Sequence, residues 1–345
     1  MTQTAKRAKK AKKESRLKLS FSEIFSICAS VILFSLLLKS PSLVSASVIN
    51  SLKQCSAFLI PSLFPLMTVS EIATECGAVD FLCRPLKSTV GKIFGIDKDA
   101  TSPFFLGLVG GYTTSVNSAV SLYQRGKISK ENCERILSFS CLPSLAFLTV
   151  FVGSGIFQSP TIGWILWLIC IASTIILSFL ERVINKMSKR KHPRKYKSEG
   201  VNDISFYQNI NYEKKSFSKI VVNAISHSAQ AMLIICACVV FFATLIFTLQ
   251  YPLEYIGISR EISFALLGSL ELTNGISACQ SVDNPLLKME LVSFFIGWSG
   301  LSIHFQIISL CDGVNLSFKR YFIFKLLQGV TCAILSLTVF FVILK

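Results

Sequence analysis

Long apolar runs separated by short basic connections are the dominant pattern of this sequence. An α-helix needs about 20 apolar residues to cross the hydrocarbon core of a bilayer. Runs of about that length or a little longer predict seven membrane-spanning helices, over residues 20–38, 47–71, 136–157, 161–180, 220–249, 286–310 and 321–344. The pattern therefore predicts an all-α polytopic membrane protein.

Two further apolar stretches are interrupted by glycine and polar residues. The first, 104–123, contains Gly110 and Gly111 and has basic connections on both sides. Basic residues mark the cytoplasmic side of a membrane protein, so two basic flanks favour a re-entrant hairpin that enters and leaves by one face. A straight span is the alternative. The stretch 262–280 predicts a second hairpin.

The composition agrees with a membrane protein. Of 345 residues, 52% are hydrophobic and 16% charged, and the mean hydropathy is +0.58. This is more apolar than a soluble domain. The net charge of +16 comes from residues that flank apolar runs, so it indicates topology and we expect no nucleic-acid partner. The twelve cysteines include no C-x-x-C pair, so we expect no metal site.

The basic segments and prolines predict the organisation of the chain. Pro61 and Pro65 predict a kinked or split helix, and Pro143 predicts a break in 136–157. We expect polar cytoplasmic connections at Arg84, Lys87, Lys92 and Lys98 and at Lys319, Arg320 and Lys325. The expected parts are a basic cytoplasmic arm (1–19), a first transmembrane helix (20–40), a first repeat (41–181), a basic cytoplasmic loop (182–219) and a second repeat (220–345). A signal peptide is the alternative for the first helix. The amino terminus is expected in the cytoplasm and the carboxyl terminus outside.

The two halves show weak internal similarity in a conserved order along the chain. Residues 49–52 are similar to 222–225, Leu106-Gly107 to Leu267-Gly268, and 137–139 to 292–294. The first helices of the two halves are expected to run in opposite directions, which predicts inverted repeats. In many secondary transporters such repeats place broken helices around a central site.

Four segments resemble a known family. Residues 107–112 (GLVGGY), 122–139, 270–275 (LELTNG) and 297–304 (GWSGLSIH) resemble the nucleoside-recognition, or Gate, domain family and its branch of sporulation integral membrane proteins of endospore-forming bacteria. The resemblance covers about residues 50–344, although Thr113 stands where members often have proline. The family is similar to the core of concentrative nucleoside transporters, which implies two hairpins and two broken helices around a central site.

Glu271 is the acidic residue of the second predicted hairpin and the strongest candidate for a functional carboxylate. A carboxylate at membrane depth is costly unless it pairs, binds a cation or carries a proton. The alternative is a helix-capping group. The expected substrate-binding residues are Gly110, Gly111, Tyr112, Thr113, Asn117, Pro143, Ser144, Glu271, Thr273, Asn274, Ser299, Ser302 and His304.

His304 and Gln306 lie two positions apart, so they point to different sides of a helix and at most one is expected to face the site. A core histidine is the alternative for His304. The same spacing excludes a direct catalytic dyad of Ser302 and His304. The sequence lacks Walker, G-x-S-x-G and H-E-x-x-H motifs, so we expect no enzyme.

The resemblance implies a cell-membrane protein of sporulation, and together with the broken helices it predicts that the protein binds or transports a small polar solute, nucleoside-like or other, by alternating access. We expect no cofactor beyond Na+ or H+ as a coupling ion at Glu271. The alternative is a non-transporting scaffold or assembly factor of the forming spore, with the loop 182–219 as its partner surface. Its partners would be a second copy of the chain or other sporulation membrane proteins, besides the lipid bilayer.

Overall fold

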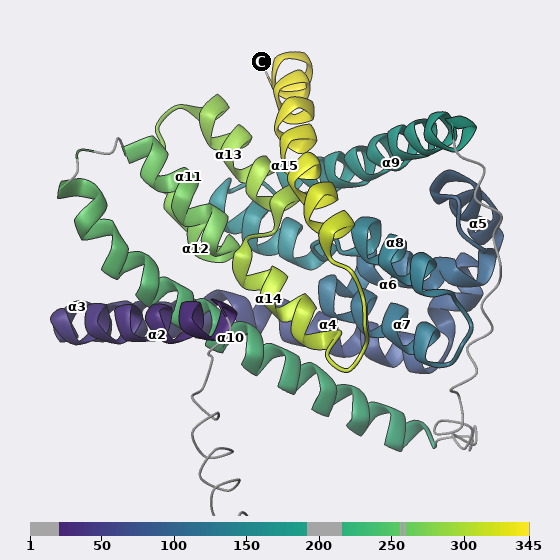
Figure 1. The fold of residues 1–345 in the computed structure, drawn as a ribbon, viewed down its shortest axis with the longest axis horizontal. Coiled ribbons are helices and arrows are strands. Elements are labelled where there is room, and N and C mark those ends of the chain that lie inside the picture. Colours follow the sequence, from purple (N-terminus) through teal and green to yellow (C-terminus); the bar gives the residue numbers. More distant parts are fainter. Residues whose placement is uncertain (1–20, 192–215, 256, 258–259, 345) are drawn as a thin grey trace, which may run out of the picture.

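The computed structural model describes residues 21–191, 216–255, 257 and 260–344, and these form helices and their connections with no strand among them (Figure 1). The basic arm 1–19 and most of the loop 182–219 lie outside the described residues. The first half contains α2 (Phe21–Lys39), α3 (Pro41–Gln54), η1 (Cys55–Leu59), α4 (Ile60–Glu75), α5 (Ala78–Phe94), η2 (Lys98–Thr101), α6 (Ser102–Gly110), α7 (Tyr112–Gln124), α8 (Lys130–Ser140), η3 (Phe147–Ile156) and α9 (Pro160–Lys191).

The second half contains α10 (Phe217–Tyr255), α11 (Arg260–Leu270), α12 (Leu272–Ala278), η4 (Cys279–Ser281), α13 (Pro285–Trp298), α14 (Leu301–Leu310), α15 (Lys319–Val339) and η5 (Phe340–Leu344). Two short helices joined at a break, α6–α7 and α11–α12, come first in each half after its long helices. A broken helix, α8–η3 or α13–α14, follows. A long helix, α9 or α15, comes next. From these short-helix pairs onward, the order of elements is therefore the same in both halves.

Five helices of the described residues are long and apolar enough to cross a membrane: Pro41–Ala73, Pro160–Val183, Phe217–Thr248, Pro285–Leu310 and Lys319–Val342. The sequence predicts seven, and two of those differ in the structure. The run at 20–38 forms α2, whose apolar part, Ser26–Lys39, is shorter than the others. The run at 136–157 is interrupted at 141–144, which confirms the break predicted at Pro143, and neither α8 nor η3 is by itself among the five long helices.

The helix around Pro61 does not split. Pro61 lacks a backbone donor, which would interrupt a regular α-helix. Here the preceding turn widens to a π-helix, and the Ile60 N–H donates to the Cys55 carbonyl. Pro65 then lies inside α4. The extra residue in the π-turn lets α3, η1 and α4 continue as one helix.

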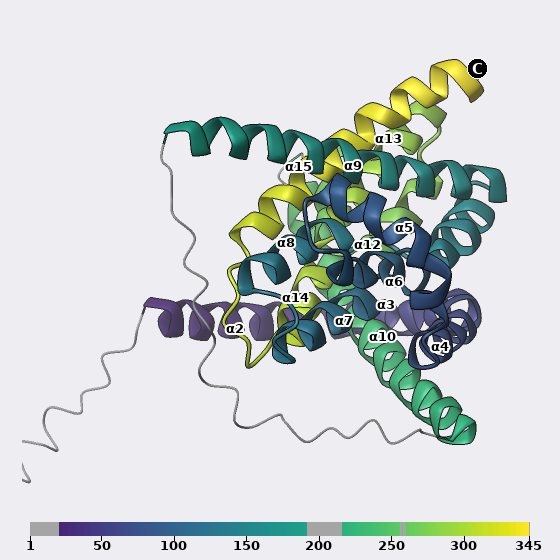
Figure 2. The ribbon, with the colours of Figure 1, turned by 90° about the vertical axis from the view of Figure 1, so that its right-hand side faces the viewer.

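The predicted polar connection around Arg84 and Lys92 is instead helix α5. Phe81, Leu82 and Leu86 are exposed on it, while Val90 and Phe94 are buried in the core. The prediction failed because basic residues share this helix with apolar residues at helical spacing. The resulting helix is amphipathic, and its carboxyl end lies beside Arg182 of α9, whose own carboxyl end extends away from α5 (Figure 2).

Glycines allow the helices of each half to pack closely. A Cβ on Gly297 of α13 would lie 2.7 Å from the Cα of Gly329 in α15, and one on Gly153 of η3 would lie 2.9 Å from the backbone N of Gly163 in α9. Small residues let membrane helices approach until their backbones touch. These contacts fix each long helix against the broken helix that precedes it.

A second pair of glycines occupies matching places in the two halves. A Cβ on Gly107 of α6 would lie 2.3 Å from the Ser140 carbonyl of α8, and one on Gly268 of α11 would lie 2.2 Å from the Phe295 ring of α13. Ser140 stands three positions after Leu137, and Phe295 three positions after Val292. The segments that are similar in sequence therefore make the same contact between the hairpin and the broken helix.

Candidate functional site

A cavity of about 70 Å³ lies where the breaks of the two halves meet. Its walls come from α4, α10 and α14, from the turn between α6 and α7, from the segment 141–144 with the start of η3, and from the turn between α11 and α12. The lining residues are Leu59, Leu63, Met67, Gly110, Gly111, Tyr112, Thr113, Ser144, Phe147, Ile235, Val239, Glu271, Leu272, Thr273, Ile303 and Gln306.

In the first half the two breaks pack directly on each other. Gly111 has φ 84° and ψ −162°, a conformation that is essentially confined to glycine. A Cβ there would lie 3.3 Å from both Cβ and N of Ser144. The Ser144 hydroxyl in turn accepts the Phe147 N–H at 3.2 Å, at the start of η3. The backbone of both breaks thus reaches the cavity wall.

The second half makes the corresponding contact between its two breaks. Here the glycine belongs to the broken helix α13–α14 and not to the short-helix pair. Gly300, in the break between α13 and α14, has φ 79° and ψ 152°, again a glycine conformation. A Cβ there would lie 2.9 Å from the Leu272 N and 3.4 Å from the Glu271 Cα. The broken helix of this half therefore packs on the turn that carries Glu271.

Glu271 both lines the cavity and caps α12. Only 2% of its surface is exposed. One carboxylate oxygen, Oε1, accepts the Thr273 N–H at 3.0 Å, and the other, Oε2, accepts the Asn274 N–H at 2.7 Å. These bonds stabilise the negative charge at the amino end of a helix. Each carboxylate oxygen has a second lone pair for a cation or for a donor group of a solute.

The structure brings seven of the predicted site residues together on this cavity: Gly110, Gly111, Tyr112, Thr113, Ser144, Glu271 and Thr273. The other six do not line it. Asn117 is exposed on α7. The Asn274 side chain turns to α10, where its Nδ2 donates to the Val239 carbonyl at 3.3 Å. Pro143, Ser299 and Ser302 are buried beside the breaks.

His304 lies away from the cavity, in an aromatic cluster. Its surface is fully buried, and its Nδ1 lies 2.7 Å from the Tyr321 hydroxyl. The ring packs against Trp298 and Phe322, with centroids 4.4 and 5.1 Å away. Gln306, two positions further, lines the cavity instead. Of the two side chains, the histidine has the core position.

The apolar part of the cavity wall was not predicted. Leu59, Leu63 and Met67 form one stripe of the α4 segment at intervals of four residues, and Ile235 and Val239 do the same on α10. Such stripes occur on every face of a membrane helix, so the sequence alone does not distinguish the face that meets the cavity. The π-turn that ends at Leu59 and the π-helix η3, which begins at the lining residue Phe147, are local structural signals, because such turns are frequent at functional sites.

Lys325 does not mark a polar turn, as its charge predicted, but is fully buried within α15. Its Nζ donates to the Cys141 carbonyl at 2.9 Å and to Gln328 Oε1 at 2.8 Å. Gln328 Nε2 donates to the Thr174 hydroxyl at 2.7 Å. The break after α8 therefore holds a cation supplied by the last long helix.

Among the described residues, one cluster away from this cavity contains side chains that could hold a metal ion. It consists of Glu71 and Glu75 on α4 and His227 on α10, whose ligand atoms lie within 4.8 Å of one another. Glu71 Oε1 lies 3.4 Å from His227 Nδ1, and this contact is also accounted for as a partly exposed ion pair.

The chain is similar to the sporulation integral membrane protein YlbJ of Bacillus subtilis (strain 168), with 26% identity over 301 residues that make up 80% of this chain and 72% of the relative. It is a homologue of this sporulation membrane protein. Together with the five apolar helices, this relationship makes the chain an integral membrane protein. No family model matches the chain, and no solved structure matches it significantly. The resemblance to the Gate family and to nucleoside transporters stays a prediction.

Proposed function

We propose that this membrane protein acts in sporulation by binding a small polar solute and moving it across the membrane by alternating access. The observation that carries this proposal is the cavity in which the breaks of both halves meet around the buried carboxylate of Glu271. Helix breaks at membrane depth leave backbone groups unpaired, and these are tolerated where they line a cavity or are buried in protein. Breaks that converge on one cavity are therefore the arrangement expected of a transport site.

The lining indicates the class of solute. Most of the wall is apolar, and its polar groups are the Glu271 carboxylate, the hydroxyls of Tyr112, Thr113 and Ser144, and the Gln306 amide. A carboxylate with remaining lone pairs favours a solute with N–H or O–H donors, or one accompanied by Na+ or H+. A nucleoside meets these requirements, as do other uncharged or cationic polar solutes. An anion would be repelled by Glu271.

The size of the cavity indicates that transport requires motion. At about 70 Å³ it is much smaller than the roughly 300–1,000 Å³ of most ligand pockets. The walls must separate to admit a solute of nucleoside size. The shared order of elements and the matched glycine contacts support two repeats. The expected orientations of their first helices make these repeats inverted, and movement of one repeat against the other would open the cavity to each side in turn.

Two matched substitutions of Glu271 test the proposal. Both Glu271→Asp and Glu271→Asn supply a favourable helix cap, but only the first keeps the negative charge. Purified protein would first be screened by thermal shift against nucleosides and amino acids, with dicarboxylates as the anionic control, and uptake of the stabilising solute would then be measured in proteoliposomes. We expect the Asp variant to retain uptake and the Asn variant to lose it at equal abundance. Equal uptake by both variants would show that transport does not require the negative charge at position 271.

The scaffold alternative predicts a different result. On that hypothesis the essential surface is the basic loop, of which residues 192–215 lie outside the described part. Deleting 192–215 should leave solute uptake intact if the protein is a transporter. If sporulation fails in the deletion strain while uptake persists and both Glu271 variants complement, the protein acts as a scaffold.

A further inference from the structure

A second cavity, of about 470 Å³, opens at the surface between the carboxyl end of α5 and residues 175–182 of α9. Residues of both helices line it: Lys92, Ile93, Ile175, Ile176, Phe179, Leu180 and Arg182. Its wall is apolar, and the two charged groups are both cations. This pocket shares no residue with the central cavity.

The pocket lies where α9 leaves its membrane-spanning part. The apolar span of that helix ends at Val183, next to Arg182. Phe179 and Leu180 on its pocket face are 63% and 48% exposed, although they are large apolar side chains. In a membrane protein such a face is covered by acyl chains, and cations at the end of the span lie at the depth of the lipid headgroups.

Arg182 binds the backbone of the residue that carries the other cation. Arg182 Nη1 donates to the Lys92 carbonyl and, at 3.2 Å, to the Ile93 carbonyl, which fixes α9 at the end of its apolar span to the last turn of α5. One guanidinium nitrogen makes both bonds, and an arginine carries five donors. Among the described residues, neither Lys92 nor Arg182 forms an ion pair with a carboxylate.

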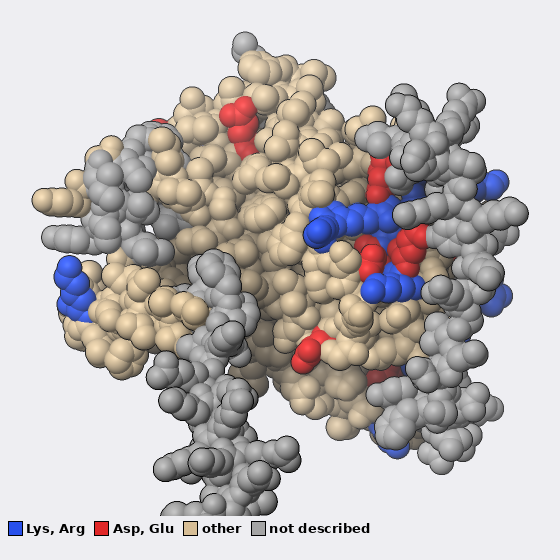
Figure 3. All heavy atoms as spheres, viewed as in Figure 1, with Lys and Arg blue, Asp and Glu red and all other residues tan. Residues whose placement is uncertain are grey.

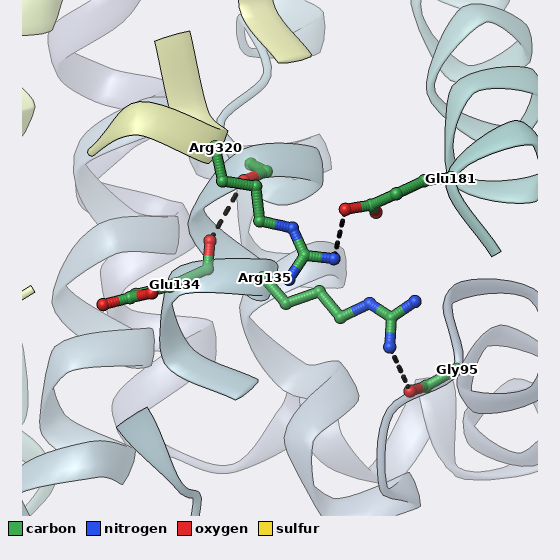
Figure 4. A network of polar contacts seen from close by, with 6 residues as sticks. Gly95, Glu134, Arg135, Glu181 and Arg320 are labelled. Atoms are coloured by element: carbon green, nitrogen blue, oxygen red, sulfur yellow. Dashed lines mark hydrogen bonds and ion pairs between the residues drawn. The ribbon is translucent and has the colours of Figure 1, made fainter. Parts of the chain in front are cut away.

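The neighbouring charges do not neutralise this pair. Glu181 is paired with Arg320, and the Glu134 carboxylate accepts the Ser317 N–H at 2.7 Å (Figure 4). Arg135 donates to the Gly95 carbonyl at 3.0 Å. Burial lowers the pKa of Arg135. Repulsion from Arg320 and Arg182 lowers it further, and the attraction of Glu181 acts in the opposite direction. Charged side chains gather on this side of the molecule, beside a broad uncharged surface (Figure 3).

We propose that the α5–α9 pocket binds an anionic phospholipid from the adjoining leaflet. The phosphate lies between Lys92 and Arg182, and an acyl chain lies along Ile175, Ile176 and Phe179. The chemistry of the pocket matches both parts of such a lipid, because its cations are at the end of a span and its apolar wall continues along the span. Basic pockets between membrane helices are known to bind anionic headgroups. A soluble phosphate would use the cations alone.

Lipid binding by the full-length protein tests the proposal. Native mass spectrometry of protein purified in detergent would compare phosphatidylglycerol with phosphatidylcholine. We expect preferential retention of phosphatidylglycerol, and about fivefold weaker binding of it in Lys92→Gln, from the usual contribution of one surface cation to lipid binding. Lys92 is suited to this test because it is exposed, whereas Arg182 also holds α5.

Two further variants make the test specific. Lys127→Gln removes an exposed cation from the turn between α7 and α8, outside the pocket, and should leave binding unchanged. Phe179→Ser keeps both cations but removes part of the apolar wall, so it should weaken binding of phosphatidylglycerol and not of glycerol 3-phosphate. An equal loss in Lys127→Gln, equal retention of phosphatidylcholine, or full competition by glycerol 3-phosphate would each overturn the lipid site.

Discussion

Single residues show how this protein accommodates buried charge. Glu271 caps the amino end of α12, and the Lys325 ammonium binds the Cys141 carbonyl at the carboxyl end of α8. Each charge lies at the helix end whose dipole has the opposite sign. The breaks thus provide partners for a carboxylate in the second half and for a cation in the first. A charged residue in an apolar segment therefore indicates a helix break nearby as readily as it indicates a polar turn.

This interpretation predicts unequal effects of two substitutions of Lys325. Lys325→Ala leaves a cavity and two unpaired acceptors, the Cys141 carbonyl and the Gln328 amide, so we expect a loss of about 2–5 kcal/mol in the free energy of unfolding. Lys325→Met leaves the same two acceptors unpaired but fills most of the space, so it should cost less than the alanine variant. Chemical denaturation in detergent measures both. An equal or larger loss for Met would show that the unpaired acceptors, and not the cavity, determine the cost.

The position of His304 gives a second prediction at this scale. Tyr321→Phe removes the hydroxyl next to His304 Nδ1 and should lower the free energy of unfolding by about 1–3 kcal/mol, because it leaves a buried ring nitrogen unpaired. Solute uptake per folded molecule should not change, since neither residue lines the cavity. Gln306→Leu, in the cavity wall, is the matched comparison and should reduce uptake. The reverse result would return His304 to the site.

At the scale of elements, the breaks were the most predictable feature and the packing faces were the least. Glycines, prolines and polar residues inside apolar runs indicate interrupted helices, and the structure has breaks at Gly111, at 141–144, at Glu271 and at 299–300. The cavity wall from α4 and α10 was not predictable, because the faces of an apolar helix look alike in sequence. Helix α5 was missed because its lysines suggested a connection.

The glycines at the breaks predict how much a substitution by alanine lowers the thermal stability. In Gly300→Ala the new Cβ would meet the Leu272 backbone at 2.9 Å in a backbone conformation that only glycine adopts readily. We expect the loss of thermal stability to be larger than that in Gly313→Ala, where φ is 76° and nothing lies within 4 Å of the Cβ. Residue 313 should show the backbone strain alone, about 1–2 kcal/mol. Equal stability of the two variants would contradict the close packing at Gly300.

At one charged side of the molecule, polar contacts connect helix α8 of the first half to the end of α5 and to the turn before α15 in the second half. Arg135 of α8 binds the Gly95 carbonyl after α5, and Glu134 binds the turn that precedes α15 (Figure 4). The two basic flanks of the α6–α7 pair are therefore neighbours in space. This contact supports re-entry of that pair by one face, because a straight span would separate its flanks by the thickness of the bilayer.

Site-directed cysteine labelling tests this topology in the membrane. Lys92→Cys and Lys130→Cys place single thiols at exposed positions on the two flanks, in a parent in which the twelve native cysteines are replaced. A membrane-impermeant maleimide should label both positions only from the cytoplasmic side, where the excess of basic residues is expected. Ser154→Cys, exposed near the end of η3, should label only from outside and so controls for leaky vesicles. If Lys92→Cys and Lys130→Cys label from opposite sides, α6–α7 crosses the membrane and the two repeats cannot be inverted in the way that alternating access requires.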